Sequence, residues 1–362
     1  MLKDESARYI RSVTPADLAV CERADSFLQS AMWGRFKSRF GWNAGSFIVD
    51  WAGGGEKPLL VLSRRIAPGI TMAYIPWGPE LPDGFTGDKA EATAELARAL
   101  RPCFPGAAFI RIDPPWFVTG NGDRGVEAPP PFKRASADTQ PPDTVLVDVT
   151  PSEENILAAM KPKWRYNIGL AEKRGVIVSE AGVDGLDNFY RLLTETAERD
   201  GIAIHSAEYY RTLFDICRNE CGTLSPQLRL YTAEHEGDTL AAVVILFRGK
   251  QAVYLYGASS NIKRNLMAPY ALQWRAMRDA KAFGCAEYDL FGIPPDENPD
   301  HPMAGLYRFK TGFGGRIIHR PGSWDYPCRP VLYALFCTAE RLRKKIRDSK
   351  KTGDRRKRRK EQ

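Results

Sequence analysis

The sequence has no hydrophobic run long enough to cross a membrane. Its longest apolar run is LAAVVILF at residues 240–247, whereas a membrane-spanning helix needs about 20 apolar residues. The first ten residues, MLKDESARYI, include two acidic side chains and no apolar segment, which disfavours a secretory signal peptide. We therefore expect a cytoplasmic protein without a membrane-spanning segment.

Histidine is scarce, and the cysteines are not spaced in pairs. The four histidines stand far apart, and the seven cysteines contain no C-x-x-C pair. This usage predicts reduced thiols rather than disulfides, and it gives no reason to expect a zinc site or another metal centre. The sequence also lacks a Ser-His-Asp or Cys-His arrangement that would indicate a covalent nucleophile.

The positive charge of the chain is unevenly distributed. The 362 residues include 52 Lys and Arg against 44 Asp and Glu, a net charge of +8. Residues 341–362 alone hold 13 basic and 3 acidic residues, a net charge of +10, so the other 340 residues carry a net charge of −2. A basic balance is typical of proteins that bind polyanions, but here it belongs to one tail.

Two stretches of the chain repeat one order of predicted elements. The second follows the first at a shift of about 180 residues, which favours two copies of an α/β unit with a mixed sheet of the acyltransferase type. A chance agreement of common α/β patterns is the alternative. We predict strands at residues 46–51, 58–65, 71–77 and 107–113 with a helix at 89–100, and then strands at 228–234, 240–247, 252–256 and 286–291 with a helix at 268–283.

A polar segment separates the two copies. Residues 118–143 are rich in glycine and proline, which is typical of an active-site loop or a linker. We expect a first domain of residues 1–143, joined by the C-terminal segment 316–345. A second domain would then span residues 144–315, and residues 346–362 would form a disordered basic tail.

The segment FLQSAMWGRFKSRFGW at residues 27–42 combines basic and aromatic side chains. As a helix it places Trp33 and Lys37 on one face. Lys37 then either extends along that face towards solvent or offers a point charge to a phosphate beside aromatic rings.

A second such segment is KPKWRYNIGLAEK at residues 161–173, which contains Arg165 and Asn167. Basic residues interleaved with aromatic ones suit contact with phosphates or with a single nucleic-acid strand. The alternative is an ordinary solvated face of a basic helix.

The segment YLYGASSNIKRNLMAP at residues 254–269 precedes a predicted helix. Tyr254 and Tyr256 stand two apart on a strand, so they are expected on one side of the sheet, either in the core or in the wall of a pocket. Residues 260–269 contain no glycine. A backbone cradle for the pyrophosphate of coenzyme A is therefore disfavoured.

The segment YRFKTGFGG at residues 307–315 holds three aromatic residues, three glycines and Lys310. Glycines let the backbone approach a ligand closely, and Lys310 could neutralise negative charge that develops during acyl transfer. The alternative is a glycine-rich turn with a surface lysine.

Taken in chain order, five motifs resemble the Fem family of peptidoglycan interpeptide-bridge enzymes. They are FLQSAMWGRFK, MKPKWRYNIGLAEKRGV, YGASS…LMAPYALQW, YDLFGI and FKTGFGG, and together they span residues 27–315. The resemblance implies two tandem GNAT-like domains. Some members carry a long helical hairpin, but no charged heptad region occurs here, so we expect the form without that arm.

The same resemblance implies a reaction. An amino acid esterified to tRNA would pass to an amine on the stem peptide of a cell-wall precursor, either a UDP-MurNAc-peptide or lipid II. Aminoacyl-tRNA would be the co-substrate, and no bound cofactor is expected. We expect the enzyme to act as a monomer.

The resemblance also assigns residue roles. Lys310 resembles the lysine that stabilises the oxyanion, and Phe309 resembles the aromatic residue that positions the tRNA acceptor end. Lys37 resembles the lysine on the precursor diphosphate. Asp113 matches an aspartate considered as a general base, a role that we rank low.

The remaining candidates belong to the expected substrate pockets. Tyr209 and Tyr256 resemble tyrosines of the precursor pocket, and His205 stands where related enzymes can use an arginine on the diphosphate. Trp33, Tyr254, Arg165 and Asn167 complete the set of candidate substrate-binding residues.

Two other functions stay open on the sequence alone. One is an acyltransferase of the same fold that acts on an amine outside peptidoglycan. The other is a non-enzymatic protein that uses its tail on tRNA or on a membrane. The tail could bind tRNA phosphates or anionic inner-leaflet lipids, at roughly 1 kcal/mol per basic residue, or it could be a disordered solubilising segment.

Overall fold

The first lobe is built on a seven-stranded mixed sheet. The computed structural model describes residues 9–117, 128–220 and 225–343. Alternate side chains of the central strands point to opposite faces, so that α1 (Ala31–Ser38) packs on one face and α2 (Lys89–Leu100) on the other. The strand order is β1-β2-β3-β4-β5-β14-β6. The strands are β1 (Ile10–Pro15), β2 (Asn43–Trp51), β3 (Gly55–Ala67), β4 (Ile70–Ile75), β5 (Ala107–Ile112), β6 (Lys133–Arg134) and β14 (Trp324–Pro327).

The second lobe has a sheet of the same kind, with helices on both faces. Its strand order is β13-β7-β12-β11-β10-β9-β8. On one face lie α3 (Glu153–Ala159), α4 (Pro162–Lys173) and α7 (Ala268–Phe283), and on the other lie α5 (Leu186–Asp200) and α6 (Ala207–Arg218). The strands are β7 (Thr144–Asp148), β8 (Ile177–Glu180), β9 (Gln227–His235), β10 (Asp238–Arg248), β11 (Gln251–Ser259), β12 (Glu287–Asp289) and β13 (Arg316–Ile318), and the short helix α8 (Ala304–Thr311) follows β12.

The two sheets confirm the predicted duplication. In each, three antiparallel strands (β2-β3-β4 and β9-β10-β11) are followed by a parallel neighbour (β5 and β12) and then by an antiparallel strand (β14 and β7). In both sheets, a buried aspartate lies at the end of the strand that pairs in parallel. Asp113 after β5 is bonded to the hydroxyl of Ser323 before β14, and Asp289 in β12 is bonded to the hydroxyl of Thr144 in β7.

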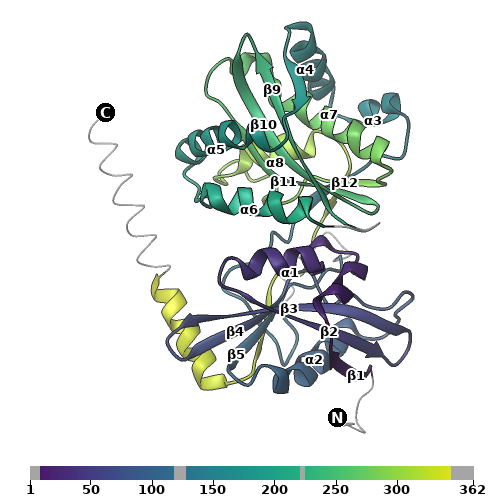
Figure 1. Cartoon of the computed structure of the whole chain (residues 1–362), viewed down its shortest axis with the longest axis vertical. Coiled ribbons are helices and arrows are strands. Elements are labelled where there is room, and N and C mark those ends of the chain that lie inside the picture. The colour runs from purple at the N-terminus through teal and green to yellow at the C-terminus, as the bar shows by residue number, and fades with distance from the viewer. Residues whose placement is uncertain (1–8, 118–127, 221–224, 344–362) are drawn as a thin grey trace.

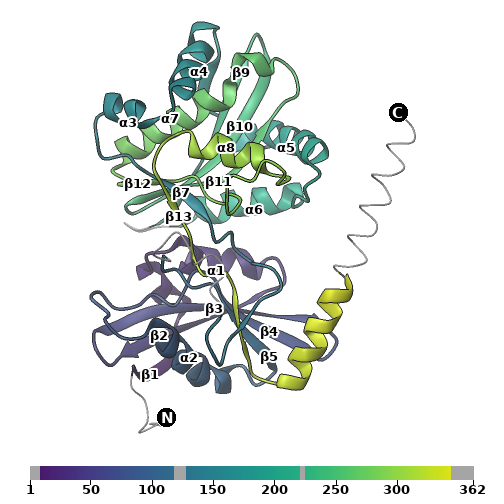
Figure 2. The ribbon, with the colours of Figure 1, turned by 180° about the vertical axis from the view of Figure 1, so that it is seen from behind.

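The chain crosses between the lobes twice. The segment before β7 leads from the first lobe to the second, and the segment between β13 and β14 leads back, so that the C-terminal strand completes the first sheet (Figure 2). Arg316–Ile318 thus pairs in the second sheet and Trp324–Pro327 in the first. A helix over residues 330–343 then packs against the first lobe through Tyr333.

The lobes share one continuous core. α1 faces α6 across the junction, and buried residues of both lobes belong to a single cluster (Figure 1). Polar contacts reinforce it. Arg35 on α1 binds Glu220 with Nε to Oε1 at 2.7 Å, and Arg248 at the end of β10 donates to the carbonyl oxygens of Glu22 and Asp25 at 2.8 and 3.0 Å.

The helix boundaries follow the predicted signals closely. α2 and α7 occupy the predicted residues, and α7 ends at Gly284, whose φ of 93° is the left-handed cap that glycine favours. α7, with 16 residues, is the longest α-helix in the described chain, so no long helical arm occurs there. No helix among the described residues is long and apolar enough to cross a bilayer. The predicted tail, residues 346–362, lies outside the described part.

Candidate active site

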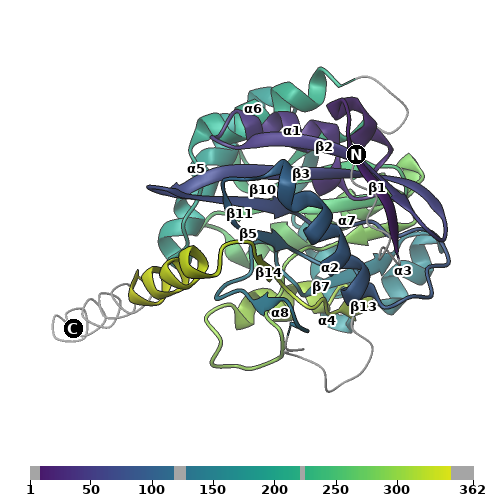
Figure 3. The same cartoon turned by 90° about the horizontal axis from the view of Figure 1, so that it is seen from below.

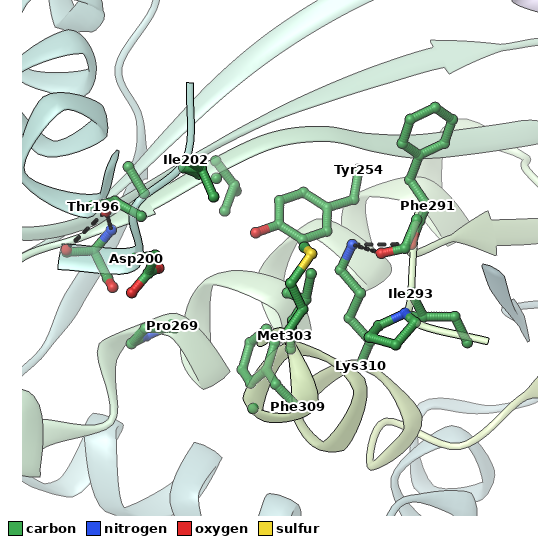
Figure 4. Close-up of a pocket in the computed structure, with 18 of the residues that line it drawn as sticks. Thr196, Asp200, Ile202, Tyr254, Pro269, Phe291, Ile293, Met303, Phe309 and Lys310 are labelled. Carbon is green, nitrogen blue, oxygen red and sulfur yellow. Dashed lines mark hydrogen bonds between the residues drawn. The ribbon is translucent and has the colours of Figure 1, made fainter. Parts of the chain in front are cut away.

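Lys310 on α8 is a buried cation that faces a cavity. Its Nζ donates hydrogen bonds to the carbonyl oxygens of Phe291 and Gly292, both at 2.9 Å, and lies 5.0 Å from the centre of the Tyr254 ring (Figure 4). Burial disfavours the ammonium form and lowers the pKa of Lys310 to about 7, an effect that the nearby Asp289 opposes. In the ammonium form the two carbonyls occupy two of the three protons, so one N–H is left for a ligand.

The cavity in front of Lys310 has a volume of about 1800 Å³. Ordinary small-molecule pockets measure about 300–1,000 Å³, so this one has room for the end of a larger substrate. Phe309 and Tyr254 lie in its wall together with Lys310 (Figure 4). Other lining residues are Thr196, Arg199, Ile202, Lys263, Pro269, Tyr270, Met303, His319 and Arg320.

α4 holds α8 in place. Trp164 Nε1 donates to the carbonyl oxygen of Phe309 at 2.9 Å, and the backbone N–H of Lys161 donates to Gly312 O at 2.9 Å. Gly312 is required for this contact, since a Cβ there would lie 2.1 Å from the Trp164 ring. The segments KPKWRYN and FKTGFGG therefore form one packed unit.

Arg165 and Asn167, predicted on this basic segment, do not line the cavity. Arg165 Nη1 donates to the backbone carbonyls of Met160 and Ala158, which satisfies the C-terminal end of α3. Asn167 is buried and contacts the hydroxyl of Tyr270. The positions of both side chains indicate structural roles.

A bulge in β11 separates the two tyrosines that were expected on one side of the sheet. The pairing shifts between Val244 and Ile245, which face Tyr256 and Tyr254, so one extra residue lies between the tyrosines. Tyr254 packs with the α7 side and faces Lys310, whereas Tyr256 packs with the α5 and α6 side. The expectation of a shared face is thus wrong, because simple alternation does not continue through a bulge.

Lys37 lies in an aromatic recess between the lobes. Its Nζ is 5.5 Å from the ring centres of both Trp33 and Tyr209, and 6.0 Å from that of Trp42. Burial, together with the nearby guanidinium of Arg64, lowers the pKa of Lys37 to about 8. Among the described residues, neither Lys37 nor Arg64 forms an ion pair with a carboxylate. The recess is therefore suited to an anionic ligand.

The other predicted precursor-pocket residues gather at the same recess. His205 stacks on Tyr209, with ring centres 3.8 Å apart, and burial and Lys37 lower the pKa of His205. Tyr209 and Tyr256 share a side-chain hydrogen bond, and Tyr210 packs edge-on against Tyr256 at 5.1 Å. At neutral pH the histidine is thus mostly uncharged, and Lys37 and Arg64 supply the positive charge.

Asp113 forms no hydrogen bond or ion pair with Lys37 or Lys310 among the described residues. It is buried at the end of β5, where it accepts hydrogen bonds from the hydroxyls of Tyr74 and Ser323. Burial raises the pKa of Asp113 to about 6. It does not line the cavity of Lys310, which is consistent with the low rank given to it as a base.

An aromatic wall joins the recess of Lys37 to the cavity of Lys310. Trp33 contacts Phe27 at 5.6 Å between ring centres, Phe27 contacts Trp77 at 6.2 Å, and Trp77 contacts Phe291 at 5.5 Å. Trp77 and Phe291 have φ angles of 40° and 54°, in the left-handed region that large side chains avoid. Such strain is concentrated at functional sites.

Sequence reasoning missed Arg64 and Arg320. Arg64 Cζ lies 4.2 Å from the ring centre of Trp42, and Arg320 Cζ lies 4.1 Å from that of Trp77. Each arginine is distant in sequence from the residues that it joins, so no motif marks it. A basic residue at the end of an otherwise apolar strand was the only available clue for Arg64.

Comparison with known proteins agrees with this arrangement. The profile of the FemAB family matches residues 130–222 and 227–341. A lipid II:glycine glycyltransferase of Staphylococcus aureus (strain USA300) is 24% identical, over 85% of this chain and 90% of that protein. The crystal structure of FemX superimposes with a TM-score of 0.73 at 21% identity, over 88% of this chain and 97% of that one.

The matched residues include β10, β11 and α8, which contribute to the lining of the cavity, and also α4 and the returning strand β14. The fold likeness to FemX extends to the first lobe as well, because it covers most of both chains. On the family match, which covers more than half of its residues, the chain belongs to the FemAB family.

Proposed function

We propose that this FemAB-family enzyme transfers an amino acid from aminoacyl-tRNA to an amine of the stem peptide of a peptidoglycan precursor. The observation that carries the proposal is Lys310, a buried lysine whose ammonium form has one N–H that no described residue accepts, at the edge of a cavity large enough for a tRNA end. The lipid II:glycine glycyltransferase that resembles the chain acts, by its name, on such a precursor.

The reaction needs positioning more than covalent catalysis. The acceptor amine attacks the carbonyl carbon of the aminoacyl ester, a C–N bond forms, and the C–O bond to the ribose breaks. The departing ribose oxygen takes up the proton that the amine loses. Lys310 stabilises the intermediate oxyanion, and Phe309 at the cavity wall contacts the end of the donor. An ester is already activated, so no enzyme nucleophile is required.

The precursor diphosphate is assigned to the recess of Lys37 and Arg64. Two cations without carboxylate partners among the described residues suit two phosphates, and the rings of Trp33 and Tyr209 exclude water from them. His205 gains a proton when an anion binds beside it, since negative charge raises the pKa of an imidazole. The aromatic wall leads the peptide from this recess towards Lys310.

An acyl-coenzyme A donor fits the second lobe poorly. In the loop before α7, the backbone N–H of Asn261 donates to Glu195 at 2.5 Å, and Ser260 Oγ donates to the same carboxylate at 3.1 Å. Lys263 is paired with Glu236 and Asp238. Carboxylates thus occupy groups that would otherwise receive a pyrophosphate.

We also propose that the C-terminal helix contacts anionic lipid on the inner face of the membrane. Its inner side holds Tyr333, whereas Val331, Leu335 and Leu342 on the opposite side are 74%, 58% and 57% exposed. These positions recur at helical spacing, and the basic residues of the tail follow directly. An apolar stripe beside cationic residues is typical of helices that lie in a membrane interface.

The function is tested by assaying a panel of charged tRNAs against the UDP-MurNAc-peptide and lipid II, with mass spectrometry of the products. The expected product is a precursor heavier by one amino-acid residue, formed from one charged tRNA or a few. Purified enzyme that leaves both precursors unmodified with every charged tRNA would contradict the proposal.

A further inference from the structure

Arg320 stands where the returning segment passes from the second lobe to the first. Its backbone N–H donates to Pro142 O at 3.1 Å, which ties together the two segments that cross between the lobes. Its guanidinium contacts two aromatic rings, with Cζ 4.1 Å from the ring centre of Trp77 and 5.6 Å from that of Phe117. The side chain is thereby held in one place before any ligand arrives.

The charge of Arg320 has no partner in the described part of the chain. Its Nε and Nη1 are buried and make no hydrogen bond with the described residues. Asp289, Asp143 and Glu287 attract the guanidinium from a distance, but none of them forms an ion pair with it. Asp289 Oδ1 accepts from the N–H of Phe291 at 2.7 Å. Burying a cation without a partner is costly, so a site of this kind is completed by a ligand.

Arg320 lies between the two proposed substrate sites. It lines the cavity that contains Lys310. Trp77, on which it stacks, belongs to the aromatic wall that runs through Phe27 towards Lys37. A peptide extending from the recess to the cavity passes this guanidinium.

We propose that Arg320 binds a carboxylate of the acceptor peptide and so places the acceptor amine near Lys310. The inference rests on the proposed function. A guanidinium fork matches the two oxygens of a carboxylate. Arg320 lies beside the aromatic wall that is assigned to the acceptor peptide, which favours the peptide over the tRNA backbone as the source of the anion.

The test measures binding without chemistry. Isothermal titration calorimetry compares the UDP-MurNAc-peptide with the same compound amidated at its peptide carboxylates, for wild type, Arg320→Gln and Arg320→Lys. Arg278→Gln is the matched control, because Arg278 pairs with Glu153 on α3 and does not line the cavity. Thermal unfolding of each variant verifies that it is folded.

Wild type is expected to bind the amidated compound about 10–100-fold more weakly, as loss of a charge-assisted hydrogen bond predicts. Arg320→Gln should bind both compounds with that weaker affinity, Arg320→Lys should fall between, and Arg278→Gln should match wild type. Equal affinity of wild type for both compounds, or unchanged binding by Arg320→Gln, overturns the inference and leaves the proposed function intact.

Two further outcomes separate the sources of the anion. If Arg320→Gln weakens binding of aminoacyl-tRNA but not of the precursor, the anion belongs to the donor and the inference is wrong. If wild type binds neither form of the UDP-MurNAc-peptide, the inference is wrong, and the proposed function fails as well if lipid II is also left unmodified. Should Arg320→Gln not fold, Arg320→Lys with the two compounds gives the same comparison.

Discussion

Burial sets the chemistry of the two candidate lysines. Both side chains are shielded from water, and this desolvation lowers the pKa of Lys310 to about 7 and that of Lys37 to about 8. Their partners differ. Lys310 is anchored by two carbonyls, which fixes its geometry, whereas Lys37 faces rings and a second cation, which leaves its charge available to an anion. The surroundings of the two lysines thus suit two different proposed roles, oxyanion stabilisation for Lys310 and diphosphate binding for Lys37.

Replacing Lys310 with alanine should abolish transfer while leaving precursor binding nearly intact. Loss of one oxyanion donor costs about 10²–10³ in rate, and Lys310 lies outside the recess of Lys37. Single-turnover transfer from charged tRNA measures the loss, and calorimetry measures precursor binding. Near-normal single-turnover transfer by Lys310→Ala would refute its assigned role.

Affinity for the precursor should fall as pH rises through about 8. The pKa of Lys37 is lowered to about 8, so its positive charge is present below that pH and lost above it. We expect about tenfold weaker binding at pH 9 than at pH 7, measured by calorimetry with the UDP-MurNAc-peptide. Lys37→Gln should bind weakly and lose this dependence; a Lys37→Gln variant with the wild-type pH profile would show that another group titrates.

At the scale of elements, the pairing of α4 with α8 explains why two distant motifs occur together. The segment KPKWRYN contains Trp164 and the segment FKTGFGG contains Gly312. The Trp164 ring packs directly against Gly312, which has no side chain to obstruct it. The sequence indicated both motifs as ligand sites. The structure adds that α4 packs against α8, a contact that the sequence did not predict, because contacts between residues so far apart in the chain have no local signature.

Gly312→Ala should destabilise the protein by about 1–3 kcal/mol, the usual cost of overpacking a filled site, since the new Cβ would lie 2.1 Å from the Trp164 ring. Displacement of Phe309 and Lys310 should also lower the transfer rate. Denaturant unfolding and single-turnover assays measure the two effects. Gly169→Ala on α4 is the control, because a Cβ there meets no atom within 4 Å, and it should be neutral or slightly stabilising. Equal stability of the two variants would contradict the packing argument.

The strands show where local pattern suffices and where it does not. The apolar run of β10 and the helical period of α7 predicted those elements, because β10 is buried on both faces along its length and α7 buries one side. The side that Tyr256 faces was mispredicted, because a bulge depends on the partner strand rather than on residues 254–256 themselves.

At the scale of the whole molecule, the C-terminal helix gives the protein a surface that its own core does not cover. Its inner residues pack on the first lobe, where Tyr333 contacts Phe109 at 5.3 Å, and its outer residues are apolar and exposed. The lobes are joined by a common core, so a membrane contact here would fix the orientation of the recess as well. Figure 3 shows the helix projecting beyond the sheets.

Full-length enzyme should bind vesicles that contain phosphatidylglycerol and not vesicles of phosphatidylcholine alone. The triple variant Val331→Ser, Leu335→Ser, Leu342→Ser should bind at least about tenfold more weakly, because it removes the apolar stripe and keeps the charge. Co-sedimentation measures both. Ile177→Ser removes an equally exposed apolar side chain elsewhere and is the control.

Deletion of residues 344–362 separates the contribution of the basic tail. We expect weaker and less salt-dependent vesicle binding, with transfer to the soluble UDP-MurNAc-peptide retained. Unchanged vesicle binding by the triple variant would show that the helix face is not in contact with lipid. Loss of binding to charged tRNA on deletion would assign the tail to the donor instead.

The sequence by itself determined the duplication, the mixed α/β class, the central helices and the motif containing Lys310, because these follow from periodicity, from capping residues and from short motifs. Only the tertiary structure decided that β13 stays in the second sheet while β14 completes the first, that Arg64 lies beside Lys37, and that Arg320 lies between the two proposed substrate sites. Those features depend on contacts across the returning chain and between the lobes, where burial and unpaired charge arise from residues far apart in sequence.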